Sequence, residues 1–206
     1  MKENEKMESI CGVILSGGES RRFGKPKAFE LYHGKAFWEY SLQAIKKVTS
    51  KQIIVSHVNL YNQFKESIEG SIQLILDEEE VRGLGPMAGL YSAMKHVKAD
   101  WYVLLSCDIP KINEATISKL LSLRQKGDEA IIPVIRERMQ PLIAVYHQSV
   151  YEKLESQLQQ HNLKMMFLLE NIHARYVSEE LDHVIASFEN INQPQDLSNL
   201  INDEKK

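Results

Sequence analysis

Basic side chains gather around two adjacent glycines just after the first apolar run of the chain. The segment LSGGESRRFGKPK, residues 15–27, carries four basic residues and one acidic residue, namely Arg21, Arg22, Lys25, Lys27 and Glu19. Four minus one gives a formal charge of +3, whereas the whole chain carries −3, so the remaining residues sum to −6. Gly17 and Gly18 permit a sharp turn that brings backbone N–H groups close to a ligand, and Arg22 and Lys27 can add charge-assisted bonds to a polyphosphate. The segment alone leaves open a simple glycine-rich turn with solvated basic residues.

This segment matches neither of the two familiar phosphate-binding loops. Five residues rather than four separate Gly18 from Gly24, and Pro26 stands where a Walker A loop has Ser or Thr after its lysine. No G-x-G-x-x-G pattern is present. The residues that follow, AFELYHGK, indicate a hairpin turning at His33 and Gly34, so we do not expect the loop to lead directly into a helix.

Asp108 is the candidate metal ligand. It follows the apolar run WYVLLS and stands two residues before Pro110. Mg²⁺ takes one or two carboxylates together with phosphate oxygens and water. A strand-end Asp is also a frequent turn former or helix cap, but Asn113 stands directly before the helical run 116–123 and is expected to cap it. Asp108 is then available for a cation.

Asp77 is a candidate for reading a nucleobase. It follows the apolar run 72–76 and precedes GPMAG, residues 85–89, where Pro suits a first helical turn and small residues permit close approach to a ligand or to the sheet. A carboxylate can accept from N1–H and N2–H₂ of guanine together, whereas cytosine presents one amino donor. The next three residues, Glu78, Glu79 and Glu80, are expected to form a solvated acidic loop.

An alternation of strands and helices must position these residues. Apolar, β-branched runs predict strands over 11–15, 53–55, 72–76, 101–106, 130–134 and 142–146, and helical spacing of apolar residues predicts helices within 38–45, 87–97, 150–158 and 163–171. This pattern predicts an α/β layered, Rossmann-like fold with a mainly parallel sheet flanked by helices on both faces. Ligands of such sheets bind beyond the carboxyl ends of the strands, where the segments singled out above all lie.

Composition indicates an ordinary globular chain of 206 residues, with 43% hydrophobic and 26% charged residues. We expect one domain over residues 1–206, with residues 1–8 disordered, in the cytoplasm, because no signal-peptide or membrane-spanning run is found. A pI near 6.2 argues against a nucleic-acid partner. The two cysteines, Cys11 and Cys107, are expected at opposite ends of neighbouring strands and therefore as free thiols.

The segment GVILSGGESRRFGKPKAF resembles the L-A-G-G-x-x-x-R-M-G-x-x-K signature of sugar-nucleotide and cofactor nucleotidyltransferases, with Ser16 in place of Ala and Phe23 in place of Met. The resemblance implies that this segment holds the phosphates of a nucleoside triphosphate, through Leu15, Ser16, Gly17, Gly18, Arg22 and Lys27. CDIP similarly resembles the C-D-x-P of that family, which implies that Asp108 binds a catalytic Mg²⁺.

GPMAG resembles the G-P-L-A-G segment of molybdenum cofactor guanylyltransferases, which implies that Asp77 and Gly85 help to seat the guanosine. After the second strand this family has Asn, whereas here Ser56 occupies that position and the next Asn is Asn59. Either Ser56 substitutes for that residue or Asn59 reaches the site.

Two later segments resemble the acceptor side of the same family. RMQPL, residues 138–142, makes Gln140 a candidate acceptor-binding residue. FENINQPQDL resembles F-x-N-x-N-T-P-x-D-L, which implies that Asn190 and Asn192 contact the pterin or metal-bound water. The residues alone also allow a plain strand and turn before a helix over 194–201.

The resemblance, which runs from residue 12 to about residue 200, implies a Mg²⁺-dependent enzyme that transfers GMP from GTP to the terminal phosphate of molybdopterin, free or molybdenum-loaded, and releases pyrophosphate. Residues up to about 110 are then nucleotide-binding and the remainder acceptor-binding. Molybdoenzyme apoproteins or other cofactor-synthesis proteins are expected partners, and a membrane is not. The alternatives are cytidylyl transfer to molybdopterin, transfer to a sugar or polyol phosphate, and a nucleotide-sensing module without catalysis.

Overall fold

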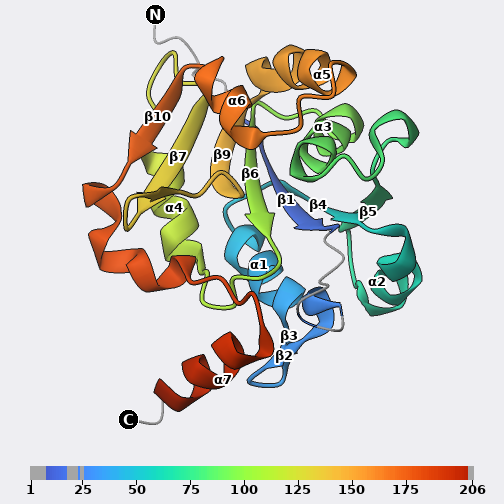
Figure 1. The fold of residues 1–206 in the computed structure, drawn as a ribbon, viewed down its shortest axis with the longest axis vertical. Coiled ribbons are helices and arrows are strands. Elements are labelled where there is room, and N and C mark those ends of the chain that lie inside the picture. The colour runs from blue at the N-terminus through green and yellow to red at the C-terminus, as the bar shows by residue number, and fades with distance from the viewer. Residues whose placement is uncertain (1–7, 18–22, 24–25, 204–206) are drawn as a thin grey trace, which may run out of the picture.

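Short apolar stretches of the chain assemble into a twisted sheet with helices on both faces (Figure 1). The computed structural model describes residues 8–17, 23 and 26–203. Within this part of the chain the sheet has eight strands in the order β10-β7-β9-β6-β1-β4-β5, with β8 paired to β7. The strands are β1 (Ile10–Ser16), β4 (Lys51–Ser56), β5 (Gln73–Leu76), β6 (Trp101–Ser106), β7 (Ala130–Ile135), β8 (Arg138–Met139), β9 (Ile143–His147) and β10 (Ala174–Val177).

The strands nearest the candidate site are parallel. β1 lies between β4 and β6 and pairs with both in parallel register, β5 pairs in parallel with the other side of β4, and β10 is parallel to β7. β9 runs antiparallel to both β6 and β7. The expected mainly parallel α/β sheet is therefore confirmed, and the four parallel strands β1, β4, β5 and β6 end at one edge.

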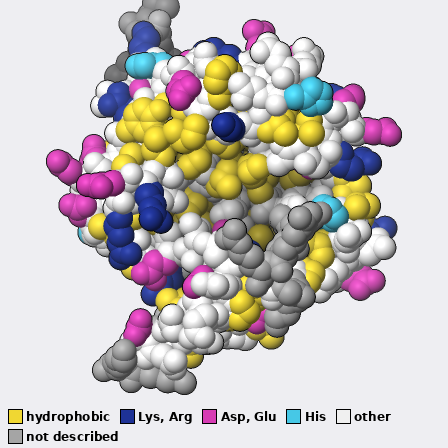
Figure 2. All heavy atoms as spheres, in the orientation of Figure 1, with side chains coloured by type: hydrophobic (Ala, Val, Ile, Leu, Met, Phe, Trp, Pro, Cys, Tyr) yellow, Lys and Arg dark blue, Asp and Glu magenta, His cyan; other side chains and the backbone are white. Residues whose placement is uncertain are grey.

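Two hydrophobic layers cover the sheet. On one face α3 (Pro86–His96), α5 (Tyr151–Gln159) and α6 (Met165–Glu170) pack over Cys11 and Val13 of β1. On the other face α1 (Phe37–Lys46), α2 (Tyr61–Ser67) and α4 (Glu114–Ser122) pack with Ile14 of the same strand. This alternation is what the period of two in a strand requires. In the same view, Figure 2 shows hydrophobic side chains gathered in a hollow near the middle of the molecule.

A third, smaller hydrophobic cluster joins the C-terminal helix to the segment around the hairpin of residues 31–36. α7 (Pro194–Asp203) contributes Leu197 and Leu200, which pack with Phe23 and with Tyr32 of the hairpin formed by β2 (Leu31–Tyr32) and β3 (Lys35–Ala36). Figure 1 shows α7 beside this hairpin, below the sheet. The C-terminal helix is thus anchored next to the segment that follows the glycine-rich loop.

Close packing at Gly12 fixes α1 on β1. A β-carbon on Gly12 would lie 2.5 Å from Cδ1 of Ile45, a residue of α1 that is fully buried. Any larger residue at position 12 would force this part of the core to move, because protein interiors are close-packed.

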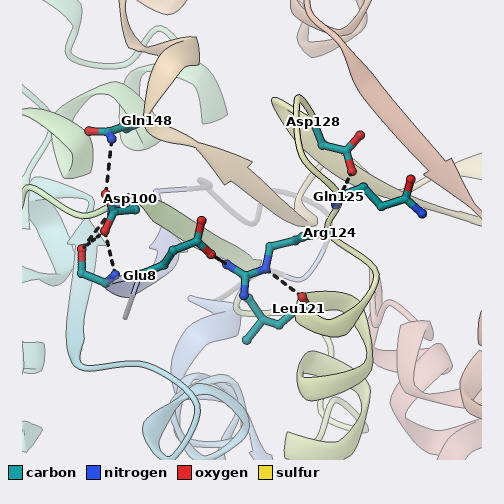
Figure 3. A network of polar contacts seen from close by, with 8 residues as sticks. Glu8, Asp100, Leu121, Arg124, Gln125, Asp128 and Gln148 are labelled. Atoms are coloured by element: carbon teal, nitrogen blue, oxygen red, sulfur yellow. Dashed lines mark hydrogen bonds and ion pairs between the residues drawn. The ribbon is translucent and has the colours of Figure 1, made fainter. Parts of the chain in front are cut away.

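Polar networks at the amino ends of the strands hold elements together (Figure 3). Asp100 accepts from the backbone N–H and the hydroxyl of Ser9, and Arg124 pairs with Glu8 and stacks over the ring of Trp101. Nearby, the guanidinium of Arg175 in β10 donates to the two carboxylate oxygens of the buried Asp128 at 2.7 and 3.1 Å. These contacts are structural.

The strands expected from the sequence are confirmed to within two residues at either end, as are the hairpin, the Asn113 cap and the helix after Pro194. Both cysteines are free thiols, as expected. Residues 1–7 of the expected disordered terminus lie outside the described residues. Among the residues described, no helix has the length and apolar character that crossing a membrane would demand.

Candidate functional site

A cavity of about 510 Å³ opens at the carboxyl ends of the four parallel strands. It has the size and position expected of a small-molecule site in an α/β sheet. Its walls include the strand-end residues Leu15, Ser16, Gly17, Val55, Ser56, Leu76, Ser106, Cys107 and Asp108, together with Lys27, His57, Asp77, Arg82, Gly83, Gly85, Gly89, Leu142 and Asn192. Residues that are far apart in the sequence therefore face one space.

Lys27 and Asp108 form the charged centre of this cavity. Lys27 begins a short 3-10 turn, Lys27–Phe29, and its Nζ donates to Oδ2 of Asp108 at 2.9 Å. The same ammonium donates to the backbone oxygen of Ile191 at 3.0 Å and to Oδ1 of Asn192 at 3.4 Å. The backbone N–H of Ile191 in turn donates to the carbonyl oxygen of Asp108 at 2.8 Å. The beginning, middle and end of the chain thus meet at one lysine.

Asp108 has an oxygen available for a cation. While Oδ2 accepts from Lys27, Oδ1 is buried and has no hydrogen-bond partner among the residues that the structure describes. A buried carboxylate oxygen without a partner is energetically unfavourable unless a ligand satisfies it. The described residues contain no cluster of three or more His, Cys, Asp or Glu side chains that could hold a metal alone. The arrangement fits Mg²⁺, which a single carboxylate can hold together with phosphate oxygens and water.

Asp77 lies on the opposite wall, directly after β5. Its Oδ2 accepts from the backbone N–H of Gly83 at 3.5 Å. Burial raises the pKa of this carboxyl, and the N–H of Gly83 and the charges of Arg82 and His57 partly offset the rise. Asp77 lines the cavity, and among the described residues only Gly83 donates a hydrogen bond to its carboxylate. It can therefore accept from donors of a ligand.

The GPMAG segment builds the wall beside Asp77. Gly85 has φ of +84°, a conformation that favours glycine, and Pro86 begins α3. A β-carbon on Gly89 would lie 2.6 Å from Cδ2 of Leu15 and 3.7 Å from Oδ1 of Asp77. Small residues here allow α3 to approach β1 closely, which is one of the two reasons that the sequence suggested.

Ser56, at the end of β4, lies at the cavity, and Asn59 lies outside it. Ser56 is buried, lines the cavity and donates its hydroxyl to the carbonyl of His57 at 2.9 Å. Asn59 does not line the cavity, and its backbone N–H donates to Nδ1 of His57. His57 and Arg82 are cavity residues that the sequence analysis missed, although both follow expected strands.

The acceptor-side candidates separate in the structure. Asn192 lines the cavity, whereas Gln140 and Asn190 do not. Gln140 closes the turn between β8 and β9, with its backbone N–H on the carbonyl of Pro133 at 2.8 Å and its side chain on that of Arg138 at 3.2 Å. Two further candidates, Gly18 and Arg22, lie outside the described residues.

One expectation about the acidic loop is wrong. Glu78 is not a solvated residue, since its side chain is 18% exposed and pairs with Lys95 and His96 of α3. The sequence analysis considered only neighbours along the chain and so missed partners seventeen and eighteen positions away. Glu79 and Glu80 are exposed, as expected.

The thiol in the cavity, that of Cys107, is poorly suited to act as a nucleophile. Burial, together with the charge of Asp108, raises the pKa of Cys107 to about 12. Because the thiolate is the reactive form, covalent catalysis through this residue is disfavoured. The charged groups described above are suited instead to binding and orienting phosphates.

The fold and the cavity together define an α/β protein whose ligand site lies at the carboxyl ends of parallel strands, where a lysine and a strand-end aspartate face one another. The model of the MobA-like NTP transferase domain matches residues 12–176, and the chain belongs to this family.

Similar proteins carry consistent names. The chain is 40% identical over 190 residues to a probable molybdenum cofactor guanylyltransferase of Halalkalibacterium halodurans, with 91% of this chain and 95% of the relative covered. A protein of the same name from Geobacillus sp. is 35% identical, with 95% and 100% covered. The crystal structure of molybdopterin-guanine dinucleotide biosynthesis protein A from Archaeoglobus fulgidus has a TM-score of 0.79 and 26% identity, covering 94% and 99%.

Proposed function

We propose that this chain is a guanylyltransferase that transfers GMP from GTP to the terminal phosphate of molybdopterin and releases pyrophosphate. The observation that carries the proposal is that Lys27, Asp108 and Asp77 line the same cavity, with Lys27 and Asp108 on one wall and Asp77 on another. The names of the relatives support the same reaction.

Charge and positioning account for the chemistry. A phosphate oxygen of the acceptor attacks the α-phosphorus of GTP in line, the bond from that phosphorus to the bridging oxygen breaks, and pyrophosphate leaves with the electron pair. The acceptor phosphate is already ionised at neutral pH, so no general base is needed. Lys27 and the backbone of Leu15, Ser16 and Gly17 stabilise the charge that moves onto the leaving group.

Mg²⁺ is the cofactor that we infer for this reaction. When bound, it would neutralise charge on the phosphate oxygens, and Asp108 would hold it through the oxygen that lacks a protein partner. Arg22 and the backbone of Gly18 are proposed to contact the same phosphates on grounds of sequence alone.

The base is selected beside α3. Asp77 accepts from N1–H and N2–H₂ of guanine, with Gly85 and Ser56 beside it on the wall of the cavity. Cytosine offers one amino donor to a carboxylate, so Asp77 favours GTP over CTP.

The acceptor is proposed to bind on the side of Asn192, because the side chain of that residue contacts the Lys27 ammonium. Gln140 and Asn190 remain candidates for parts of molybdopterin that extend outside the cavity. Residues up to about 110 would then serve the nucleotide and later residues the acceptor. A protein that receives the finished cofactor is the expected partner beyond these substrates.

The test is release of pyrophosphate from GTP, CTP or ATP in the presence of molybdopterin and Mg²⁺. We expect release with GTP, loss of it with excess EDTA, and loss of it in Asp108→Ala. The matched control is Glu152→Ala, which removes an exposed carboxylate on α5 away from the cavity. Release with CTP instead would reassign the chain to cytidylyl transfer. Tight GTP binding without release under any acceptor would favour a nucleotide sensor.

A further inference from the structure

Glu78 links the base-reading loop to a helix. Its carboxylate binds Nζ of Lys95 through Oε2 and Nε2 of His96 through Oε1, the latter at 2.8 Å. The bond to Lys95 is the main reason that the pKa of Glu78 lies below its ordinary value. Charge-assisted bonds of this kind are stronger and more directional than neutral ones.

The backbone of the same residue is fixed as well. The N–H of Glu78 donates to Oγ of Ser92 at 2.8 Å, and Ser92 is a fully buried residue of α3. The peptide that joins Asp77 to Glu78 is therefore held from one side by a buried hydroxyl, and the side chain of Glu78 is held by Lys95 and His96. The orientation of the Asp77 carboxylate depends on that peptide.

The loop is tied to α3 at both of its ends. Glu78 bonds to residues in the middle and at the end of the helix, and Gly85 leads directly into Pro86 at its start. Between these points Val81 is buried, while Arg82 and Gly83 line the cavity. Because α3 also packs closely on β1 through Gly89, the wall that carries Asp77 is built on the same helix as the wall that carries Leu15.

We propose that Glu78 is a positioning residue for nucleobase selection, which acts by holding Asp77 toward the cavity through its bonds to Ser92, Lys95 and His96. This inference rests on the proposed function, in which Asp77 reads guanine. A binding group must be held to within about 0.5 Å of its productive position to discriminate between ligands. A carboxylate on a loop that no contact fixes would therefore discriminate weakly between nucleobases. Glu78 makes no contact with the nucleotide itself in this proposal.

The experiment compares GTP with ITP, whose base lacks the 2-amino group. The kcat/KM values for both nucleotides, and their dissociation constants from calorimetry without acceptor, are measured for the wild type and for variants. Glu78→Gln removes the charge and keeps the shape, and Lys95→Met removes the main partner. The reference variant is Asp77→Asn. The matched control is Glu79→Gln, which makes the same change one residue further along at an exposed position.

We expect Glu78→Gln and Lys95→Met to lower the ratio of kcat/KM for GTP to kcat/KM for ITP by about tenfold, mostly through a higher KM for GTP. This is the size of effect expected when the 2-amino group of guanine loses its acceptor, the Asp77 carboxylate. Glu79→Gln should retain the wild-type ratio. If the role of Glu78 were solely structural, its replacement would lower the melting temperature and reduce kcat/KM for GTP and ITP equally. An unchanged ratio of the two kcat/KM values in Glu78→Gln and Lys95→Met therefore overturns the proposal.

The failure of the proposed function would look different. A wild-type protein that neither binds GTP nor turns it over would remove the function, and this inference with it. A protein that prefers GTP, but whose preference survives Asp77→Asn, would leave guanylyl transfer in place and overturn the role of both Asp77 and Glu78.

Discussion

Replacing Gly89 with alanine should damage the nucleotide site more than the fold. The new β-carbon would lie 2.6 Å from Cδ2 of Leu15, a partly exposed side chain that lines the cavity. Carbon atoms pack best at about 3.5 to 4.0 Å, so the Leu15 methyl group must move by about 1 Å. The nucleotide cavity is the open space beside this side chain, and we expect it to move there.

Stability changes little because two effects oppose each other. Overpacking costs about 1 to 3 kcal/mol when the neighbours are rigid, and less when the neighbour is the end of a partly exposed side chain. Alanine stabilises a helix interior by roughly 0.5 to 1 kcal/mol relative to glycine. The variant should therefore fold with nearly the wild-type melting temperature. A displacement of about 1 Å in a binding site can nevertheless lower kcat/KM by up to roughly 100-fold.

Calorimetric titration of GTP and pyrophosphate release will test this reasoning. We expect Gly89→Ala to bind GTP about tenfold or more weakly, since a shift of about 1 Å disturbs a site built around that side chain. Adding Leu15→Val, which shortens the obstructing side chain, should restore most of the affinity in the double variant. Wild-type affinity in Gly89→Ala alone, or no recovery in the double variant, would refute the inference that Gly89 keeps the Leu15 side chain out of the nucleotide site.

Three further predictions concern the fold and its titration. Gly12→Ala meets the fully buried Ile45 and should lower the free energy of unfolding by about 1 to 3 kcal/mol, measured from urea midpoints. Arg175→Met leaves the buried Asp128 carboxylate uncompensated and should lower that free energy by about 3 kcal/mol at pH 7. Burial alone would raise the pKa of Asp128, but hydrogen bonds from Arg175 and a backbone N–H hold it below its ordinary value, so wild-type stability should fall as the pH drops below about 4 and the variant should lose less. Because burial raises the pKa of both thiols to about 12, neither cysteine should react with iodoacetamide at pH 8 until the protein is unfolded.

The elements around the cavity could be predicted because their signals are local. β6 is a run of five apolar residues that ends at Ser106, and the prediction matched its bounds. α3 follows a Gly-Pro step, and α4 follows Asn113, whose side chain accepts from the N–H of Thr116 at 3.0 Å. In each case the signal lies within a few residues of the element that it defines.

Other elements could not be predicted because their partners are distant in sequence. α2 buries only Phe64, so its apolar pattern is too weak to indicate a helix. β10 is half-buried at the sheet edge, and it is held by pairing with β7 rather than by its composition. The antiparallel direction of β9 likewise follows from its neighbours, because alternation along a strand is the same in either direction.

The site divides in the same way. The rule that ligands bind beyond the carboxyl ends of parallel strands was enough to predict that Lys27, Asp77 and Asp108 line one cavity. It could not tell which of several polar residues near each strand end point inward. His57 and Arg82 were missed for that reason, and Gln140 was named although it closes a turn outside the cavity.

The C-terminal residues are part of the site rather than an extension of the domain. The family model ends at residue 176, yet Ile191 and Asn192 supply two of the oxygens around the Lys27 ammonium. Residues 191–192 are held in place by the backbone bond to Asp108 and by the packing of α7 against the hairpin that follows Lys27. The Lys27 ammonium, which we propose to bind the triphosphate, is therefore oriented by the last elements of the chain, and we expect the arrangement around it to be complete only when α7 has docked.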